Sequence, residues 1–538
     1  MLSTLPIECL EEIIKNLDYK SLYSCILVNC LLSSVSVQYL WKFPFGYFKE
    51  PNKLIIQTYL NCLPESSKLT LLKNDVELPL TTTSHAPTYN YPSFIRKICI
   101  KSLFITTEAL FEKYDRTSVL LIVRELCKLF IANSVKIERL ELTFDHTSLK
   151  NFPVDYPVYD WYLLLPTFPG AKESLSNLKE LILDSNFDQR GILIALSKIC
   201  HKIENLDVYY NEHTIHDLTL GKLIKKQRNL KIFSTFLYEG GWSIGPPLWQ
   251  HRNSLKEIIF HRVNFNDCTS LLGLAKCVDL ERLIFRESFN LQKGLLDEFS
   301  RECNLPKLRE FSYELLFLDL DIEEVTYDIS SMLKRTNRSL KCLTFNDSFR
   351  SVQSQLWEIS TPYISLQSIE TITLYCQNLV LIDATITKTL STPFLAVLSS
   401  CNRLQELVLY LNNDVELEEY LPDIGKKLSK SLRILEISTL NDFSVESLNG
   451  LLSNCKARLS KFNLLYSRCF NDQHLDVVVK YAREIVGSSL DELKLYSKSK
   501  GFITLDDLQA AAKYRSPTDE VSNAAERGGR QGRRPLSQ

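Results

Sequence analysis

The residues of this 538-residue chain best suited to metal binding or nucleophilic chemistry are its 15 cysteines and 8 histidines. No two cysteines have the C-x-x-C spacing that brings two thiols onto one zinc ion or into one redox disulfide. His213 and His216 are three residues apart, a spacing that suits metal ligands, but no cysteine set accompanies them. We interpret both as loop or surface residues and predict neither a metal site nor a cofactor. The odd number of scattered thiols favours a reducing, intracellular compartment.

Sequence motifs of enzymes give no better candidate. The phosphate-binding pattern G-x-x-x-x-G-K-[ST] and the zinc-protease pattern H-E-x-x-H are both absent. A glycine-bearing stretch at 240–245 is followed by Pro246 and Pro247, from which we expect no helix N-terminus for a phosphate group. A cysteine–histidine pair for covalent catalysis would have to be assumed, because the sequence itself shows none. We therefore expect a protein that is not an enzyme.

Length, composition and charge restrict the architecture and the partners. A chain of 538 residues exceeds one ordinary core, so several domains or a repeat array are expected. The 63 Lys and Arg residues balance the 64 Asp and Glu residues, so charge predicts neither a nucleic-acid nor a membrane partner. Residues 21–41 carry no charge, but their serines make a poor membrane span, and the preceding acidic residues oppose a signal peptide. We interpret this stretch as buried helix and expect a cytoplasmic or nuclear protein.

The first forty-five residues have the pattern of three short helices. Apolar residues at 10, 13, 14 and 17 form one helical stripe, residues 18–21 interrupt it, and a second apolar set begins at Leu22. A third segment ends at Leu40-Trp41. Three helices of this length bury too little surface for an independent core, which favours a partner.

This segment resembles the F-box family. The resemblance covers about residues 1–45 and is carried by Leu5-Pro6 with Glu8, the stripe from Leu10 to Leu17, Leu22 and Cys25, the Val28-Asn29 pair and Leu40-Trp41. The sequence departs from the common pattern at Cys30, where many members have a basic residue, and at Leu32, where an aromatic residue is frequent. The resemblance implies docking on the Skp adaptor of a cullin-based ubiquitin ligase; the alternative is a helical cap on a repeat array. The adaptor-binding residues that it implies are Leu5, Pro6, Ile7, Glu8, Leu10, Ile13, Ile14, Leu17, Leu22 and Val28.

A repeat of the form apolar-x-x-apolar-x-apolar occupies most of the remaining chain. Most steps between first positions lie between 25 and 32 residues, which is typical of leucine-rich repeats with one strand and one helix per unit. Packed helices need more room than hydrogen-bonded strands, so the predicted solenoid is an α/β array with a concave parallel sheet and helices on its convex side. The repeats expected from the pattern start at 137, 178, 203, 230, 255, 280, 308, 340, 369, 404, 432, 459 and 490.

Cysteines recur at the predicted corners between helix and strand. Cys200, Cys277 and Cys401 each precede a repeat start by three residues, and Cys455 precedes one by four. Successive repeats would hold these thiols apart, so we interpret them as small buried residues rather than metal ligands. The placement resembles the cysteine-containing class of leucine-rich repeat that often follows an F-box.

Alternation along each strand predicts which side chains face the concave side. Tyrosine recurs at these positions, which suits a recognition surface. An apolar floor of Ile259 and Ile284 beside His261 and Arg286 would suit a peptide with an acidic or phosphorylated residue; the alternative is ordinary packing and solvation. The predicted target-binding residues are Ile182, Tyr209, Ile259, His261, Ile284, Arg286, Tyr375 and Tyr410.

The resulting expectation is a substrate receptor in a Skp–cullin–F-box ubiquitin ligase, which would hold an unknown target protein near the ligase. Its rival is a leucine-rich repeat scaffold or inhibitor with no ubiquitin role. The expected domains are an F-box at 1–45, a helical and irregular linker at 46–136 containing a helix over 118–133, the solenoid at 137–510, and a disordered Arg- and Gly-containing tail at 516–538.

Overall fold

The structure is a computed structural model of the full chain. It describes residues 5–46, 51–79, 87–143, 162–183, 190–209, 218–236, 244–266, 268, 271–315, 326–336, 338–347, 363–465, 469–482, 492–497 and 501–504. The predicted tail at 516–538, together with His213 and His216, lies outside these residues. The chain divides into two compact units, residues 1–295 and 296–538.

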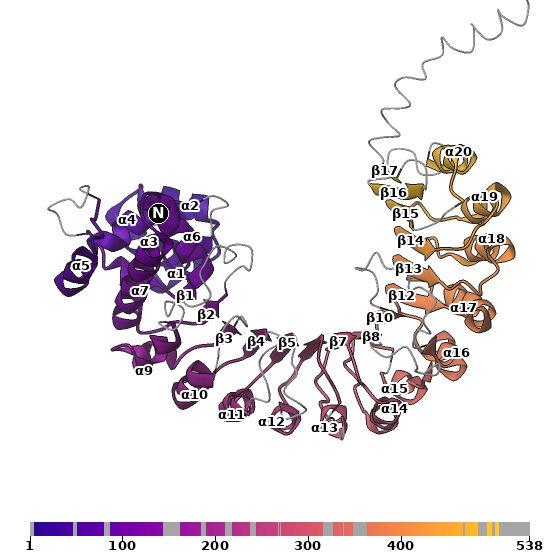
Figure 1. The fold of residues 1–538 in the computed structure, drawn as a ribbon, viewed down its shortest axis with the longest axis horizontal. Helices are drawn as coiled ribbons and strands as arrows, with labels where there is room; N and C mark the ends of the chain where they lie inside the picture. The colour runs from indigo at the N-terminus through magenta and orange to yellow at the C-terminus, as the bar shows by residue number, and fades with distance from the viewer. Residues whose placement is uncertain are drawn as a thin grey trace, which may run out of the picture. The chain divides into compact units, whose positions relative to one another are not determined.

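The first unit contains a parallel sheet in which each strand pairs with the next along the chain (Figure 1). Its strands are β1 (Lys97–Cys99), β2 (Arg139–Leu142), β3 (Glu180–Leu183), β4 (Asn205–Tyr209), β5 (Ile232–Phe236), β6 (Glu257–His261) and β7 (Arg282–Ser288). Its repeat helices are α10 (Arg190–Ile199), α11 (Thr219–Lys226), α12 (Gly245–Trp249) and α13 (Leu272–Ala275), which line one side of the sheet. The pieces before α10 on this side are η5 (Tyr162–Thr167) and α9 (Ala171–Leu175).

The second unit repeats this construction, again with strands in chain order. Its strands are β8 (Glu310–Leu315), β10 (Cys342–Asp347), β12 (Leu381–Ile386), β13 (Glu406–Leu411), β14 (Ile434–Thr439), β15 (Lys461–Leu465) and β16 (Glu492–Ser497), ending with an antiparallel β17 (Gly501–Thr504). A separate pair joins β9 (Thr326–Tyr327) to β11 (Tyr363–Ile364). The helices are α14 (Lys293–Glu302), in which the division between the units falls, α15 (Ser330–Arg335), α16 (Leu366–Tyr375), α17 (Lys388–Ser400), α18 (Leu417–Lys427), α19 (Val445–Asn454) and α20 (Asp472–Tyr481).

The apolar positions of the repeat form the core between strands and helices. In β3, for example, Leu181 and Leu183 are buried, whereas Glu180 and Ile182 on the other face are half-buried. The same alternation recurs in β2 and β4. Every second residue of these strands is buried against the layer of helices, because side chains alternate along a strand. Each unit is therefore a stretch of leucine-rich repeat solenoid, and the predicted fold is confirmed. Among the described residues, no helix is long and apolar enough to cross a membrane.

The predicted repeat at 369 is wrong. Ile369, Ile372 and Leu374 lie in helix α16, whose N-terminus is capped by Ser365, and the strand of this repeat is β12, which follows Leu379. The misassignment arose because residues three apart also share one face of a helix: Ile369 and Ile372 are buried, while Leu374 is 63% exposed. Placing the repeat start at 379 makes Cys376 a further cysteine three residues before a start.

The corner cysteines are buried, as predicted. Cys200, Cys277, Cys376 and Cys401 have no measurable exposure, and burial raises the pKa of the Cys401 thiol to about 11. The Cys200 thiol donates a hydrogen bond to the Leu175 carbonyl oxygen of the preceding repeat, at 3.4 Å. A thiol with a raised pKa therefore fills each of these corners, and those of Cys200 and Cys401 contact a backbone carbonyl of the preceding repeat.

The parallel sheet begins earlier than the repeat pattern predicted. Strand β1, at 97–99, pairs with β2 and precedes residue 137, where we expected the array to start. The helices around it are α4 (Lys53–Asn61), α5 (Glu65–Leu72), η3 (Tyr91–Phe94), α6 (Ile100–Leu110) and α7 (Arg116–Asn133). Ile95, Ile98 and Ile100 are all buried and match the full repeat pattern, so the signal for this strand is present in the sequence and was missed. Helix α6 begins directly at Ile100.

Candidate binding surfaces

Three helices form at the positions predicted for the N-terminal module: α1 (Ile7–Ile14), α2 (Tyr19–Ile26) and α3 (Cys30–Leu40). Asp18 caps α2 by accepting a hydrogen bond from the Ser21 amide at 2.8 Å, and Asn29 caps α3 by accepting one from the Leu32 amide at 2.8 Å. Both α1 and α2 pack on α3. Their shared core consists of Leu10, Ile14, Leu22, Leu32 and Val35, with Leu17 partly buried against it.

The predicted adaptor-binding residues separate into two groups. Leu10, Ile14 and Leu22 hold the helices together and are not available to a partner, and Leu17 is only half-buried. Pro6 and Glu8 are exposed. Six large apolar side chains in or beside α1, α2 and the turn to α3 are between 38% and 71% exposed. We call them the helical apolar surface: Leu5, Ile7, Ile13, Tyr23, Leu27 and Val28.

The two departures from the F-box pattern have different structural consequences. Leu32 is buried in the three-helix core. Cys30, at the start of α3, is exposed. The first departure therefore affects packing, and only the second changes the surface beside Val28.

The segment that follows α3 fixes the module to the first repeats. The Trp41 ring lies 4.3 Å from the Tyr91 ring and 5.2 Å from the Tyr59 ring, and Phe45 in η2 (Pro44–Gly46) is buried. Tyr59 in turn packs edge-on against Phe130 of α7, at 4.8 Å. This aromatic cluster joins the module to the helices around β1.

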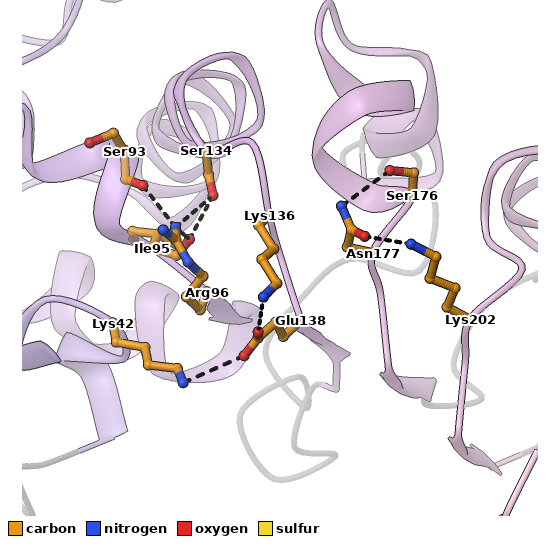
Figure 2. A network of polar contacts seen from close by, with 10 residues as sticks. All are labelled: Lys42, Ser93, Ile95, Arg96, Ser134, Lys136, Glu138, Ser176, Asn177 and Lys202. Atoms are coloured by element: carbon orange, nitrogen blue, oxygen red, sulfur yellow. Dashed lines mark hydrogen bonds and ion pairs between the residues drawn. The ribbon is translucent and has the colours of Figure 1, made fainter. Parts of the chain in front are cut away.

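Polar contacts reinforce the same junction (Figure 2). The Lys42 carbonyl oxygen accepts a hydrogen bond from the Arg96 amide at 3.0 Å, and the Lys42 ammonium lies 3.5 Å from Glu138, which also pairs with Lys136. The Ser134 hydroxyl donates to the Ile95 carbonyl oxygen at 2.6 Å. One side of the module is therefore sealed on the repeat array, while the helical apolar surface stays exposed.

The second surface is the outward face of β4–β7 in the first unit, where strand register brings the predicted residues together. Ile259 pairs with Ile284 and His261 with Arg286, as the sequence predicted. Ile259 is half-buried and Arg286 exposed, whereas Ile284 is buried. Tyr209 stands in the same row as His261, with Phe236 between them.

Aromatic contacts connect these strands. The Phe236 ring lies 5.7 Å from the Tyr209 ring and 4.2 Å from the His261 ring. Sequence reasoning missed Phe236 because Thr235 replaces an apolar residue in this repeat and hides the strand pattern. The signal that would have found it is its position, three residues after Phe233, as His261 is three after Ile258.

Two residues at the ends of β6 and β7 have left-handed backbone conformations. Arg262 has φ 54° and Glu287 has φ 48°, values that non-glycine residues rarely adopt. Their side chains pair at 2.5 Å, and the Arg262 guanidinium lies 5.8 Å from the centre of the Phe236 ring. Burial lowers the pKa of His261, although Glu287 at 3.6 Å opposes this, so the imidazole is neutral at pH 7. The cationic Arg262, at the edge of the outward face of β4–β7, is thus already paired with Glu287.

Two further arginines on this face are paired with carboxylates, whereas Asp207 is not paired with any described residue. Arg139 bonds to Glu141 and Glu180, both at 2.9 Å, and Arg282 bonds to Glu257 at 2.7 Å. Asp207, half-buried between Ile182 and Ser234, forms no hydrogen bond or ion pair with the described residues. Burial, and then the nearby Glu180 and Glu257, raise the pKa of its carboxyl to about 6.

In the second unit, the structure contradicts two predicted target-binding residues. Tyr375 lies at the end of helix α16 rather than on a strand, so it cannot face the concave side. Tyr410 does lie on the outward row of β13, but it is only 8% exposed. Its register neighbours Thr385 and Ser438 are buried as well. The accessible part of the predicted target surface therefore lies in the first unit.

The structure corrects the expectation for the stretch 240–245, which also contains a second pattern. A helix, α12, does begin there, but it has five residues, and Pro246 and Pro247 remove amide donors from its first turn. The residues 241–245 also match G-x-S-x-G, the spacing of a nucleophile elbow, which requires the serine to follow directly from a strand. Strand β5 ends at Phe236, seven positions before Ser243, which lies outside the described residues.

In the described part of the chain, no group of His, Cys, Asp and Glu could hold a metal ion.

Comparisons with known proteins add little to this picture. No protein-family model matches the sequence, and no curated protein matches it. A solved structure with a similar arrangement is the leucine-rich repeat-containing protein LegL7 from Legionella pneumophila: the sequences are 11% identical, the TM-score is 0.30, and the match covers 58% of this chain and 91% of that one. A TM-score this low carries no argument, so the assignment to the leucine-rich repeat fold rests on the strands and helices themselves.

Proposed function

We propose that this chain is the substrate-recognition subunit of a Skp–cullin–F-box ubiquitin ligase. The observation that carries the proposal is the helical apolar surface, in which Leu27 and Val28 are 71% and 64% exposed. Exposed apolar side chains that cluster on a small helical module are typical of a protein–protein interface. Docking on the adaptor would bury them.

The division of labour within the chain follows from the same arrangement. The contacts of Trp41 and Lys42 fix the module to the first repeats. A target held on the repeats would therefore stay close to the ligase, which raises the effective concentration of its lysines. The ubiquitin-transfer chemistry would belong to other subunits, and this chain would act as a non-enzymatic receptor in the cytoplasm or nucleus.

The rival function is a leucine-rich repeat scaffold or inhibitor, with the N-terminal helices as a cap. The sealed junction between Trp41, Tyr59 and Tyr91 favours this interpretation, because a terminal cap protects the first repeat in the same way. The helical apolar surface opposes it, since a cap presents a polar outer face. The two functions differ in one measurable respect, which is affinity for the adaptor.

The test is a binding measurement between the full chain and purified Skp adaptor. A double substitution, Ile13→Glu with Val28→Glu, should abolish saturable binding because it places charge in the proposed interface without touching the core. Leu72→Glu is the matched control: Leu72 is 60% exposed on α5, outside the module, and its substitution should leave binding unchanged. Unaltered thermal unfolding of each variant would show that the fold is retained. Absence of adaptor binding by the unmodified chain, or equal binding by the double variant, would overturn the proposal in favour of the scaffold.

A further inference from the structure

Several arginines on or beside the outward face of β2–β7 are already paired with carboxylates of the same unit. The guanidinium groups of Arg139, Arg282 and Arg262 each bond to carboxylates of this unit. An incoming anion would have to displace those carboxylates. The sequence suggested an acidic or phosphorylated peptide beside Arg286, which is exposed. The engagement of Arg139, Arg282 and Arg262 argues against an anion on the rest of this face.

Asp207 presents the opposite situation. Its carboxyl lies on the sheet floor, where burial and then Glu180 and Glu257 raise its pKa. Arg139, whose charge lowers that pKa, is already bonded to two other carboxylates. The raised pKa of Asp207 reflects this shortage of positive charge. A cation brought to this carboxyl would relieve the repulsion and gain a partly desolvated ion pair.

The surroundings of Asp207 suit the rest of a basic side chain. Tyr209 lies two residues further along the same strand, on the same face, and 38% of it is exposed. The rings of Tyr209 and Phe236 can receive a cation or its methylene stem. On the other side, Ser234 and Ile259 continue the row, so an apolar residue of the same peptide would find an apolar neighbour.

We propose that the outward face of β3–β7 binds an extended peptide through an arginine or lysine side chain that pairs with Asp207 and packs against Tyr209. This deepens the proposed function, because the peptide would belong to the target protein. Binding of this peptide at Asp207 and Tyr209 does not depend on the adaptor. Charge complementarity decides the occupant. A carboxylate with no hydrogen bond or ion pair to the described residues, on a face where Arg139, Arg262 and Arg282 are already bonded to carboxylates, selects a basic peptide.

The experiment selects ligands from random sequences, because the chemistry of the face identifies a class of peptide and not one target. A phage-displayed library of random dodecapeptides is panned on the full chain, and in parallel on Asp207→Asn and on Glu204→Gln. Glu204 precedes the same strand and pairs with Lys231 at 2.7 Å, so its variant removes one negative charge outside the proposed site. The most enriched sequence is then synthesised with a fluorescent label, and its affinity is measured by anisotropy.

The expected result is enrichment of peptides with arginine or lysine beside an apolar residue. Their affinity should fall at least about tenfold with Asp207→Asn or Tyr209→Leu and stay unchanged with Glu204→Gln. Enrichment of acidic peptides, equal binding by Asp207→Asn, or no enrichment at all would overturn the inference. Adaptor binding is measured separately with variants of α1 and α2, so loss of peptide selection with intact docking refutes this inference alone.

Discussion

Strands β4–β7 of the first unit and β12–β15 of the second follow the same inward pattern but have different outward faces. In both, alternate residues such as Leu206 and Leu407 are completely buried against the helical layer. On the outward face, Asp207, Ser234 and Ile259 of the first unit remain half-buried, at least partly open to solvent. Ile284 alone of that row is buried. In the second unit, Val408, Tyr410, Ser438 and Asn463 are all at most 8% exposed, and Asp383 and Glu436 are half-buried.

This difference shows that the repeat determines one face of a strand and leaves the other undetermined. Inward residues are set by the period, because a one-residue shift would place polar groups in the core. Outward residues receive no such constraint, and their accessibility depends on what lies over them. A tyrosine in the outward row can be a recognition residue, as Tyr209 is positioned to be, or a buried one, as Tyr410 is.

A matched pair of substitutions that each introduce a carboxylate on the outward face should produce the largest difference in the free energy of unfolding. Val408→Glu would bury an unpaired carboxylate in the second unit and should destabilise it by about 3–5 kcal/mol. Ile259→Glu, at the corresponding outward row of the first unit, should cost about 1 kcal/mol because water can still reach the new group. Urea unfolding followed by circular dichroism measures both. Similar losses in the two variants would contradict the difference in accessibility.

The sequence predicted those parts of the fold that a local period determines. The strand positions, the three N-terminal helices and the buried corner cysteines required only the spacing of apolar residues and small residues at turns. The repeat at 369 failed because its spacing also fits one face of a helix, and Ser365, which caps that helix, was the local signal against a strand. Strand β1 was missed although Ile95, Ile98 and Ile100 match the pattern, because this repeat start lies 42 residues before the next one at 137, outside the period of 25–32.

The candidate surfaces were harder to predict because they depend on pairing across repeats. Register between Ile259 and Ile284 followed from the period, and so the sequence identified that pair correctly. The isolation of Asp207 did not follow, since it depends on Arg139 bonding to Glu141 and Glu180. Likewise, which residues of α1 face inward could be estimated from its stripe, but the exposure of Ile13 depends on how α1 packs on α3.

Asp207→Asn should separate recognition from stability. The carboxyl has a higher pKa in the folded protein, about 6, than its ordinary value of 3.8, so the folded state holds its proton more tightly than the unfolded state does. Stability from this group is therefore present below about pH 4 and is lost as the pH rises through 6. The variant should be about 1–2 kcal/mol more stable than the unmodified chain at about pH 7, after allowance for solvent screening, and should match it at about pH 4.

Urea unfolding at several pH values measures this difference, with Glu204→Gln as the control that should alter stability by no more than about 0.5 kcal/mol. A variant that gains stability while losing peptide binding would show that the first unit retains an unfavourable carboxylate on its accessible face. A gain that does not depend on pH would contradict the proposed origin of the raised pKa.

The smallest effect concerns the core beneath that accessible face. Thr235 of β5 occupies an inward position between Val208 and Phe260, is 1% exposed, and its hydroxyl has no hydrogen-bond partner among the described residues. Thr235→Val keeps the shape and removes the unsatisfied group, so it should stabilise the first unit by about 1 kcal/mol. Thr107→Val is the control, because the buried Thr107 hydroxyl donates to the Leu103 carbonyl oxygen at 2.8 Å and its loss should bring no gain. If Thr235→Val instead lowers the free energy of unfolding, the Thr235 hydroxyl must be hydrogen-bonded in solution. Thr235 would then stabilise the core beneath Phe236 and Asp207.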